Sequence, residues 1–332
     1  MIEWTISRIE LPLKFPWKIA RGTSFSKTNF LITADCDGTI GKGEVAFNTR
    51  YGESEESIEQ GFQHFLDHGG EELNSLEKLI QLVEELELDS SLCFGLESAL
   101  AHANATMSGR TIHQLLCLPQ VHGVATSFSL PIMEPSEVQA FLDKHNLSRF
   151  PALKIKLGSE GAIDLVQEVA KFYKGPLRLD ANEAYTDPAE YLKLCQDLEG
   201  MPIQFIEQPF AASEFALYRE VKAKSLFPIF ADESLTSGEV IPEFKELFHG
   251  VNVKLMKAGG YMRALKQLRT ARELGLSTML GCMVETSLGI SSAMNLANNV
   301  DFCDLDGCLL ISEDPFKAVS EEGGVLNYNY VI

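Results

Sequence analysis

Apolar and polar residues follow two different rhythms along this chain, and the change falls near residue 124. The first part begins with strand-like stretches and continues with helical ones. The predicted strands cover residues 3–12 and 28–36 and, after a hairpin turn at Asp37–Gly38, residues 39–47. The predicted helices cover residues 54–68, 75–87 and 92–108. Strands followed by helices, without alternation, are typical of a small α+β domain.

From residue 124 onwards, short apolar strands alternate with amphipathic helices such as residues 162–173. The predicted strands are residues 124–132, 152–157, 176–181, 203–207, 228–232, 251–256, 277–283 and 302–306. Strict strand–helix alternation favours a parallel sheet, and eight such strands at about 25-residue spacing favour a closed α/β barrel. Because this spacing is compact for such a barrel, we expect one covering helix to be missing or displaced.

The change of rhythm predicts two domains, which agrees with a length of 332 residues. We assign residues 1–120 to the α+β domain and residues 121–310 to the barrel. Residues 311–332 follow the last barrel strand, and we expect them to return to the N-terminal domain and complete it.

Composition and charge narrow the range of partners. With 45% hydrophobic and 23% charged residues, the chain has the profile of a globular protein. Its net charge of -19 makes nucleic acid and anionic membranes poor partners, although a local cation can still hold an anionic substrate.

The start of the chain reads as a strand rather than a signal peptide, and no apolar run approaches the ~20 residues that span a bilayer. Seven scattered cysteines without a CxxC pair predict reduced thiols in a cytoplasmic protein.

The main functional signal is a set of charged residues late in the predicted barrel strands. Alternate residues of a barrel strand point inward, and enzymes on this fold build their sites at the C-terminal strand ends. In each strand, the charged residues occupy the phase opposite to the aliphatic residues. The set comprises Lys154, Lys156, Asp180, Glu207, Asp232, Lys254, Asp304 and Asp306, and Arg178 shares the phase of Asp180.

Each of these residues taken alone has a plainer explanation. An Asp after a strand is commonly a helix N-cap or a turn residue, and residues 153–157 alone are typical of a half-solvated antiparallel strand. The combination argues against these explanations, because helices cover the outside of a parallel barrel and unpaired charges inside it would be very costly. Lysines and carboxylates that share one pocket, together with a bound cation, resolve that cost.

Three carboxylates from consecutive strands, Asp180, Glu207 and Asp232, are suited to a hard divalent cation. We expect one Mg²⁺ per subunit, since Mg²⁺ prefers oxygen ligands and keeps positions open for substrate. No histidine or cysteine accompanies them, which argues against zinc. The lysines on either side indicate acid–base chemistry, because a desolvated lysine beside a cation has a lowered pKa and accepts a proton near neutral pH.

The Lys154-Ile155-Lys156 segment, the three carboxylates and Lys254 resemble, in this order and spacing, the motifs of the enolase superfamily, and in particular its muconate-lactonising subgroup. The resemblance covers nearly the whole chain. It implies an α/β fold in which a modified TIM barrel, of the (β/α)7β kind, follows an α+β N-terminal capping domain. It also implies an enzyme that uses Mg²⁺ and lysine bases to stabilise an enediolate.

Further stretches are similar to dipeptide epimerases. Residues 252–260 resemble their sixth-strand motif, and residues 281–287, which include Met283, resemble their seventh strand. Asp304-Leu305-Asp306 resembles the pair that binds the free amino group of the substrate. The charges alone lead to the same expectation, because two inward carboxylates outside the metal set require a cation such as an ammonium. We therefore expect Asp304, Asp306 and Met283 to bind a dipeptide.

The resemblance implies a 1,1-proton transfer at the α-carbon of the C-terminal residue of a dipeptide, through an enolate. Lys156 and Lys254 would be the catalytic bases on opposite faces of that carbon, while Mg²⁺ and Lys154 would bind and stabilise the carboxylate end. The C-terminal residue is expected to invert, because inversion at the other residue would need a different anchor for the carboxylate.

Residues 15–24 resemble the specificity loop of the same family. Arg21 is a candidate for binding an acidic substrate side chain, as in the L-Ala-D/L-Glu epimerases of peptidoglycan recycling, and a plain surface arginine is an equal alternative. Lys18 and Trp17 are comparable candidates.

Several alternatives stay open at this point. A cycloisomerase or o-succinylbenzoate synthase of the same superfamily would share the lysines and metal ligands but would not need Asp304 and Asp306. A sugar-acid dehydratase or mandelate-racemase-like enzyme usually needs a barrel histidine, and none of the seven histidines occupies a late, inward strand position. A non-catalytic ligand-binding barrel is the alternative of another class, although no lysine or carboxylate of the set is missing. A homo-oligomer is compatible with the sequence.

Overall fold

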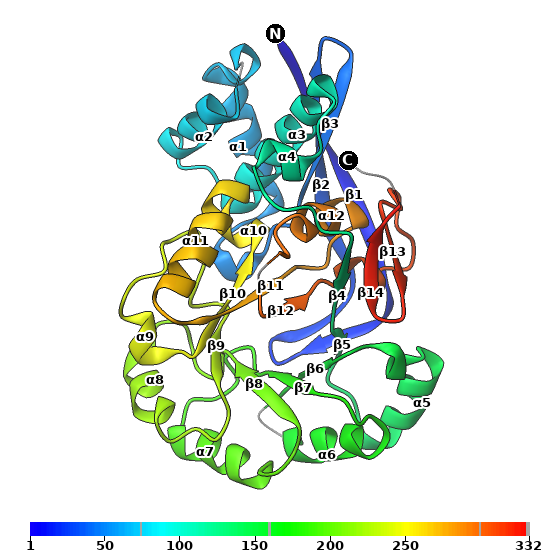
Figure 1. The fold of residues 1–332 in the computed structure, drawn as a ribbon, viewed down its shortest axis with the longest axis vertical. Coiled ribbons are helices and arrows are strands. Elements are labelled where there is room, and N and C mark those ends of the chain that lie inside the picture. Colours follow the sequence, from blue (N-terminus) through cyan, green and yellow to red (C-terminus); the bar gives the residue numbers. More distant parts are fainter. Residues whose placement is uncertain (74, 159–160, 299, 330–332) are drawn as a thin grey trace.

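The N-terminal part of the chain, called the cap below, forms an antiparallel sheet beside a group of helices (Figure 1). The computed structural model describes residues 1–73, 75–158, 161–298 and 300–329. The sheet consists of β1 (Ile2–Ile19), β2 (Gly22–Cys36) and β3 (Thr39–Val45). The helices are α1 (Glu55–Asp67), α2 (Leu76–Glu85), α3 (Ser90–Ser108) and α4 (Ile112–Leu115). The predicted hairpin turn is present, because Asp37 and Gly38 connect β2 to β3 with positive φ angles of 52° and 87°.

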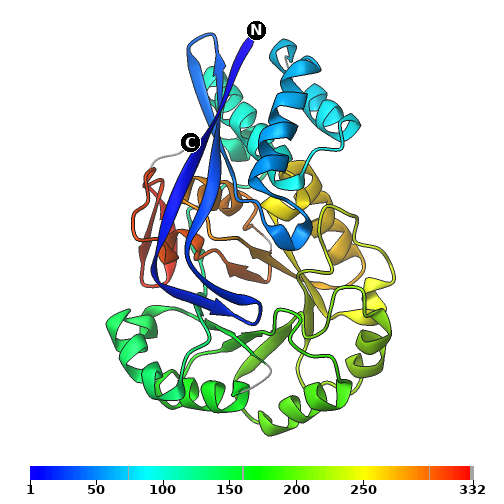
Figure 2. The same cartoon turned by 180° about the vertical axis from the view of Figure 1, so that it is seen from behind.

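The β1–β2 hairpin is longer than the sequence pattern predicts. The two strands stay paired to a turn at residues 20–21, with a register shift between Pro12 and Trp17. This dark blue ribbon runs from the cap down to the barrel in Figure 2. Residues 15–24, which we expected to form a loop, are therefore the tip of a β-hairpin.

Helix α3 is buried on nearly all sides because it lies between the cap sheet and the barrel. Gly41 and Gly43 of β3 face this helix, and a Cβ atom at either position would overlap a carbonyl oxygen of α3. On its other side, Phe94 packs edge-on against Tyr261. Close backbone packing therefore holds the cap sheet against α3, and α3 connects the sheet to the barrel.

Eight parallel strands form the second part, and each neighbours the next in chain order. They are β5 (Phe128–Leu130), β6 (Leu153–Lys156), β7 (Leu177–Asp180), β8 (Ile203–Glu207), β9 (Ile229–Ala231), β10 (Gly250–Lys254), β11 (Ser277–Gly281) and β12 (Phe302–Asp304). The first and last strands approach each other where the Ser127 amide donates a hydrogen bond to the Cys303 carbonyl at 3.3 Å. The α/β fold with a nearly closed, modified TIM barrel is thus confirmed.

Helices alternate with the strands in this part of the chain, and α5 to α9 and α11 lie around the outside of the barrel in Figure 1. The helices are α5 (Val138–Lys144), α6 (Ala162–Phe172), α7 (Pro188–Asp197), α8 (Phe215–Lys222), α9 (Phe244–Leu247), α10 (Leu255–Ala258), α11 (Tyr261–Glu273), α12 (Ser287–Met294) and α13 (Gly307–Leu310). Short 3₁₀ turns occur at Thr49–Tyr51, Gly70–Glu72, Pro135–Glu137 and Leu147–Arg149. Between β9 and β10, the helix α9 is a single turn, which contributes to the compact spacing of the strands. Among the described residues, no helix has the length and apolar character needed to cross a membrane.

The C-terminal segment pairs with a strand that the sequence pattern did not separate. The predicted strand 124–132 is divided into β4 (Gly123–Ala125) and β5, and β4 joins a small sheet with β13 (Val319–Glu322) and β14 (Val325–Tyr328). The segment also touches the cap, where Ile311 bridges Leu13 of β1. The division at residues 1–120, 121–310 and 311–332 stays a prediction.

Side chains alternate along the barrel strands between the outside and the inside of the barrel. Outward residues such as Leu179, Ile206 and Val253 belong to the core between the strands and the helices. Inward residues form a separate apolar cluster, built from Phe205, Phe230, Met279 and Phe302. Arg178 lies over the Phe302 ring, and its guanidinium donates to the Cys303 carbonyl at 2.7 Å. This cluster forms the floor on which the next inward layer, the charged one, rests.

Because β3 packs closely against α3, one added methyl group on β3 should strongly lower the free energy of unfolding. Gly43→Ala should lower the free energy of unfolding by about 1–3 kcal/mol, because the new Cβ forces the strand away from the Gly95 carbonyl. Gly238→Ala is the control, since a Cβ there meets nothing within 4 Å, and its effect should stay within about 0.5 kcal/mol. Denaturant titration followed by circular dichroism measures both, and equal effects would contradict the packing argument.

Candidate active site

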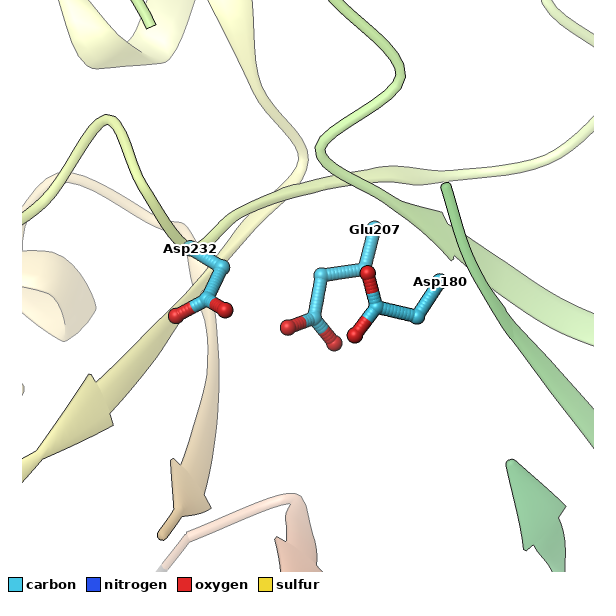
Figure 3. Close-up of side chains that lie close together, drawn as sticks. All are labelled: Asp180, Glu207 and Asp232. Carbon is cyan, nitrogen blue, oxygen red and sulfur yellow. The ribbon is translucent and has the colours of Figure 1, made fainter. Parts of the chain in front are cut away.

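Three carboxylates meet in the charged inward layer. Asp180 and Glu207 end β7 and β8, and Asp232 follows β9. The register places Asp180 opposite Glu207, and Figure 3 shows the three carboxyl groups turned toward one another. One oxygen atom from each lies within 4.8 Å of the others, and all three residues are buried. The structure thus brings together the three residues that we expected to bind Mg²⁺.

The lysines surround this trio on both sides. Lys156 donates to Asp180 Oδ2 at 2.6 Å, and Lys254 donates to Asp232 Oδ2 at 2.8 Å. These lysines stand on β6 and β10, the two strands that flank the three carboxylate strands. Lys154 lies deeper, with its Nζ 3.1 Å from Asp180 Oδ2 and 2.9 Å from Glu207 Oε2. The trio therefore has one lysine at each end and a third against its side.

Burial and charge act against each other in this cluster. Burial raises the pKa of Asp180 and Asp232, but the nearby lysines together lower it by more than burial raises it. Both carboxyl pKa values therefore lie below the ordinary range. Burial and the Asp180 charge raise the pKa of Glu207 to about 8. Burial lowers the pKa of Lys154 and Lys254, but the neighbouring carboxylates raise it more. The lowered lysine pKa that we expected is therefore not produced by the protein groups alone.

The carboxylate trio fits a hard divalent cation. Among the described residues, no histidine or cysteine completes it, and oxygen ligands are those that Mg²⁺ prefers. Asn252 donates to Glu207 Oε1 at 2.9 Å and fixes this side chain, while Glu207 Oε2 is buried and has the Lys154 ammonium 2.9 Å away but not in hydrogen-bonding geometry. A second cation beside Lys154 would give this oxygen a ligand partner and would offset the repulsion that raises the Glu207 pKa.

The two aspartates outside the trio lie at and just after the end of β12. Asp304 accepts hydrogen bonds from Ser127 Oγ at 2.6 Å and from Lys154 Nζ at 2.8 Å. Asp306 accepts one from the Ser129 amide at 2.6 Å, and burial, followed by the Asp304 charge, raises its pKa to about 7. Asp304 and Asp306 thus have Lys154 as their one lysine partner among the described residues, and their binding of a substrate ammonium stays a prediction.

The hairpin tip places the three specificity candidates differently. Trp17 lines the cavity described next, whereas Lys18 is exposed on the opposite face of β1 and does not line it. Arg21 lines the cavity as well, but its guanidinium donates to Glu233 Oε1 at 2.9 Å and lies 3.6 Å from Glu183 Oε2. The role of Arg21 in binding substrate stays a prediction, and its charge is already paired within the protein.

A cavity of about 430 Å³ opens between the hairpin and the C-terminal ends of the barrel strands. This volume is within the usual range for a small-molecule site. Of the predicted site residues, Lys154, Lys156, Lys254, Asp232, Asp304, Asp306, Met283 and Arg21 line it. Asp180 and Glu207 are fully buried and do not line it. One cavity thus unites the lysines with one edge of the carboxylate trio and the β12 aspartates.

Some residues of the site were not identified from the sequence. Lys257 is buried, and its Nζ lies 2.5 Å from Asp232 Oδ1. Its place in residues 252–260, the segment similar to the sixth-strand motif of dipeptide epimerases, could have identified it. Tyr51, Lys27 and Ser129 also line the cavity. Nothing in the local sequence pattern sets them apart, because they come from the cap or from the start of the barrel.

A barrel under an antiparallel cap, with a carboxylate trio between lysines, defines the class of enolase-like proteins. The family model "Enolase C-terminal domain-like" matches residues 136–315. The L-Ala-D/L-amino acid epimerase of Pedosphaera parvula is 35% identical over 96% of this chain and 94% of its own length. The chain belongs to the dipeptide epimerase family of the enolase superfamily.

Solved structures agree with this assignment. A substrate-liganded complex of the L-Ala-D/L-Glu epimerase from Bacillus subtilis superimposes with a TM-score of 0.89 at 29% identity, covering 98% of this chain and 95% of that one. A dipeptide epimerase from Enterococcus faecalis, complexed with Mg and L-Leu-L-Tyr, gives 0.85 at 26% identity over 99% and 97%. These relatives share the fold and differ in the dipeptide that their names specify.

Metal binding should depend on the trio and not on carboxylates in general. Mg²⁺ should stabilise the wild-type protein against unfolding by about 2.7 kcal/mol at a hundredfold excess over its Kd, because it binds only the folded state. Glu207→Gln should abolish this gain. Asp304→Asn, which removes a buried carboxylate outside the trio, should keep it. Thermal melts with and without Mg²⁺ measure the gain, and a gain that persists in Glu207→Gln would contradict the assignment.

Proposed function

We propose that this protein is a Mg²⁺-dependent dipeptide epimerase that inverts the α-carbon of the C-terminal residue. The observation that carries the proposal is the placement of Lys156 and Lys254 on the two strands that flank the carboxylate trio. An inversion needs one group that removes the α-proton from one face and another that returns a proton to the opposite face. Two bases of one residue type, on either side of a carboxylate-binding centre, meet this requirement.

Each lysine has a defined part in the proposed reaction. One of Lys156 and Lys254 removes the α-proton in its neutral form, and the other, protonated, donates a proton to the opposite face. The Lys154 ammonium lies against Asp180, Glu207 and Asp304 and directs positive charge to the oxygen atoms that become more negative in the enolate. Asp180, Glu207 and Asp232 would hold Mg²⁺, which would supply further positive charge to the substrate carboxylate.

The opposite end of the substrate would be fixed by its amino group. Asp304 and Asp306 offer two buried carboxylates with only one lysine partner, and an ammonium group supplies the missing charge. A cycloisomerase or o-succinylbenzoate synthase substrate has no ammonium to place there. This difference favours a dipeptide over the substrates of those two relatives.

We propose a cytoplasmic location, because all seven cysteines are free thiols, six of them at least partly buried. A role in peptidoglycan recycling would follow if the substrate is an L-Ala-L-Glu type dipeptide. A homo-oligomer is part of the same proposal, as such assemblies are common among soluble proteins.

Deuterium exchange tests the two-base arrangement. Wild-type protein with Mg²⁺ in D₂O should give a one-unit mass gain in both the L,L and the L,D form of a substrate dipeptide, and EDTA should stop it. Lys156→Ala and Lys254→Ala should each reduce epimerisation by about 10²–10⁴-fold. Each variant should still exchange the α-proton of one epimer, and the two variants should prefer opposite epimers.

Lys171→Ala, on an exposed face of α6, is the control and should behave like the wild type. Loss of exchange with both epimers in each lysine variant would contradict separate bases on two faces. No exchange with any dipeptide, from folded and Mg²⁺-loaded protein, would refute the epimerase proposal and favour a cycloisomerase or synthase.

Blocking the amino group tests the aspartate pair. N-acetylation of a substrate dipeptide should lower kcat/KM by about tenfold to a hundredfold, because the charge-assisted hydrogen bonds to Asp304 and Asp306 are lost. In Asp306→Asn the free dipeptide should already react poorly, so the additional effect of acetylation should be smaller. Steady-state kinetics on both substrates with both proteins gives the coupling, and an equal acetylation penalty in the two proteins would argue against Asp306 as a partner.

A further inference from the structure

The far side of the cavity from the barrel is formed by the cap, and it carries one lysine that the proposed reaction does not use. Lys27 stands on β2 in the same phase as Asn29, two residues further along the strand. Asn29 donates to the Val284 carbonyl at 3.0 Å, so this face of β2 is directed at the loop that follows β11. Both residues line the cavity, so the Lys27 side chain belongs to the wall that the cap forms.

Charge pairing sets Lys27 apart from every other cation of the cavity. The cationic side chains that line it are those of Arg21, Lys27, Arg50, Lys154, Lys156 and Lys254. Five of them have carboxylate partners, from the 2.5 Å contact of Arg50 with Glu183 to the 3.1 Å contact of Lys154 with Asp180. In the described part of the chain, Lys27 alone among them has neither an ion-pair nor a hydrogen-bond partner.

The surroundings of Lys27 make an unpaired charge costly. The side chain is half-buried, and burial together with the nearby Arg21 charge lowers the pKa of its ammonium. A partly desolvated cation beside another cation is stabilised when an anion joins it. Arg21 itself is paired with Glu233 and Glu183, and Lys27 has no carboxylate partner among the described residues, so an anion bound in the cavity would be its partner.

The tetrahedral α-carbon decides which part of the substrate faces Lys27. In the proposed binding mode the carboxylate points to the trio, the hydrogen to Lys156 or Lys254, and the peptide nitrogen toward Asp304 and Asp306. The fourth substituent, the side chain of the inverting residue, has only the direction of the cap left. Lys27 lies on that wall.

We propose that Lys27 binds the side-chain carboxylate of the residue that inverts, and that the substrates are therefore dipeptides with C-terminal Glu or Asp. The proposal rests on the proposed epimerase function and adds to it the class of side chain. It also moves the recognition of acid from Arg21, whose charge is used to hold the hairpin tip on the barrel, to a residue on β2.

The test compares two substrates that differ in charge and hardly in shape, L-Ala-L-Glu and L-Ala-L-Gln. With the Mg²⁺-loaded full-length protein, kcat/KM for L-Ala-L-Glu should exceed that for L-Ala-L-Gln by at least about tenfold, since a charge-assisted pair is lost with the amide. Lys27→Met should lower kcat/KM for L-Ala-L-Glu by about tenfold to a hundredfold, mainly through KM, and leave L-Ala-L-Gln within about threefold. Lys27→Arg should restore most of the preference for the acid.

Lys18→Met is the matched control, because Lys18 stands on the same hairpin but is exposed on the face away from the cavity. It should leave both substrates unchanged. Equal kcat/KM for the two substrates in the wild type, or an equal loss for both in Lys27→Met, would overturn the assignment of Lys27 while epimerisation itself still stands. Absence of exchange with these and all other dipeptides would instead refute the proposed function, and this inference with it.

Discussion

Repulsion among buried carboxylates is the constraint on which the rest of this site depends. Asp180, Glu207 and Asp232 approach one another within 4.8 Å in the barrel interior, where unpaired negative charge is very costly. The adjoining strands supply the compensation: Lys156 and Lys254 pair with the outer members, and Lys154 contacts two of the three. The aromatic floor excludes water from below, which makes each of these pairs stronger than it would be in solvent.

The cap depends on the barrel through a second buried carboxylate. Glu44, on β3, accepts hydrogen bonds from the Thr286 amide at 3.0 Å and from Asn29 at 2.7 Å, and so holds the start of α12 against the cap sheet. Asn29 in turn reaches the Val284 carbonyl. These bonds fix β2 over the cavity. They also fix the position of Lys27, because the period of two along a strand carries orientation from Asn29 to its neighbour.

The sequence predicted the inward barrel layer and the helices and strands of the cap, but not the tip of the β1–β2 hairpin or the ion pairs made there, for a physical reason. Barrel strands are covered on the outside, so a set of charged residues in the inward phase needs partners inside the barrel, and Asp180, Glu207 and Asp232 could be placed together from the sequence. The hairpin strands have one solvated face, where charge is ordinary. The sequence therefore left Arg21 equally as a binding residue or a surface arginine, although Glu233 and Glu183 pair with it, and nothing in the sequence set Lys27 apart from a surface lysine. Those ion pairs join residues about two hundred positions apart, which no local pattern reveals.

The paired lysines of the cavity come from the barrel, and the one lysine without a described partner comes from the cap. The barrel lysines are bound by carboxylates of the same barrel, so their positions are set by the fold and suit a reaction that is the same for every dipeptide. The cap contributes the one lining cation that lacks a described partner, and its position follows from the hairpin. Relatives named for L-Ala-D/L-Glu and for a complex with L-Leu-L-Tyr share this fold, and in this chain we propose that the cap carries the selectivity for the substrate side chain.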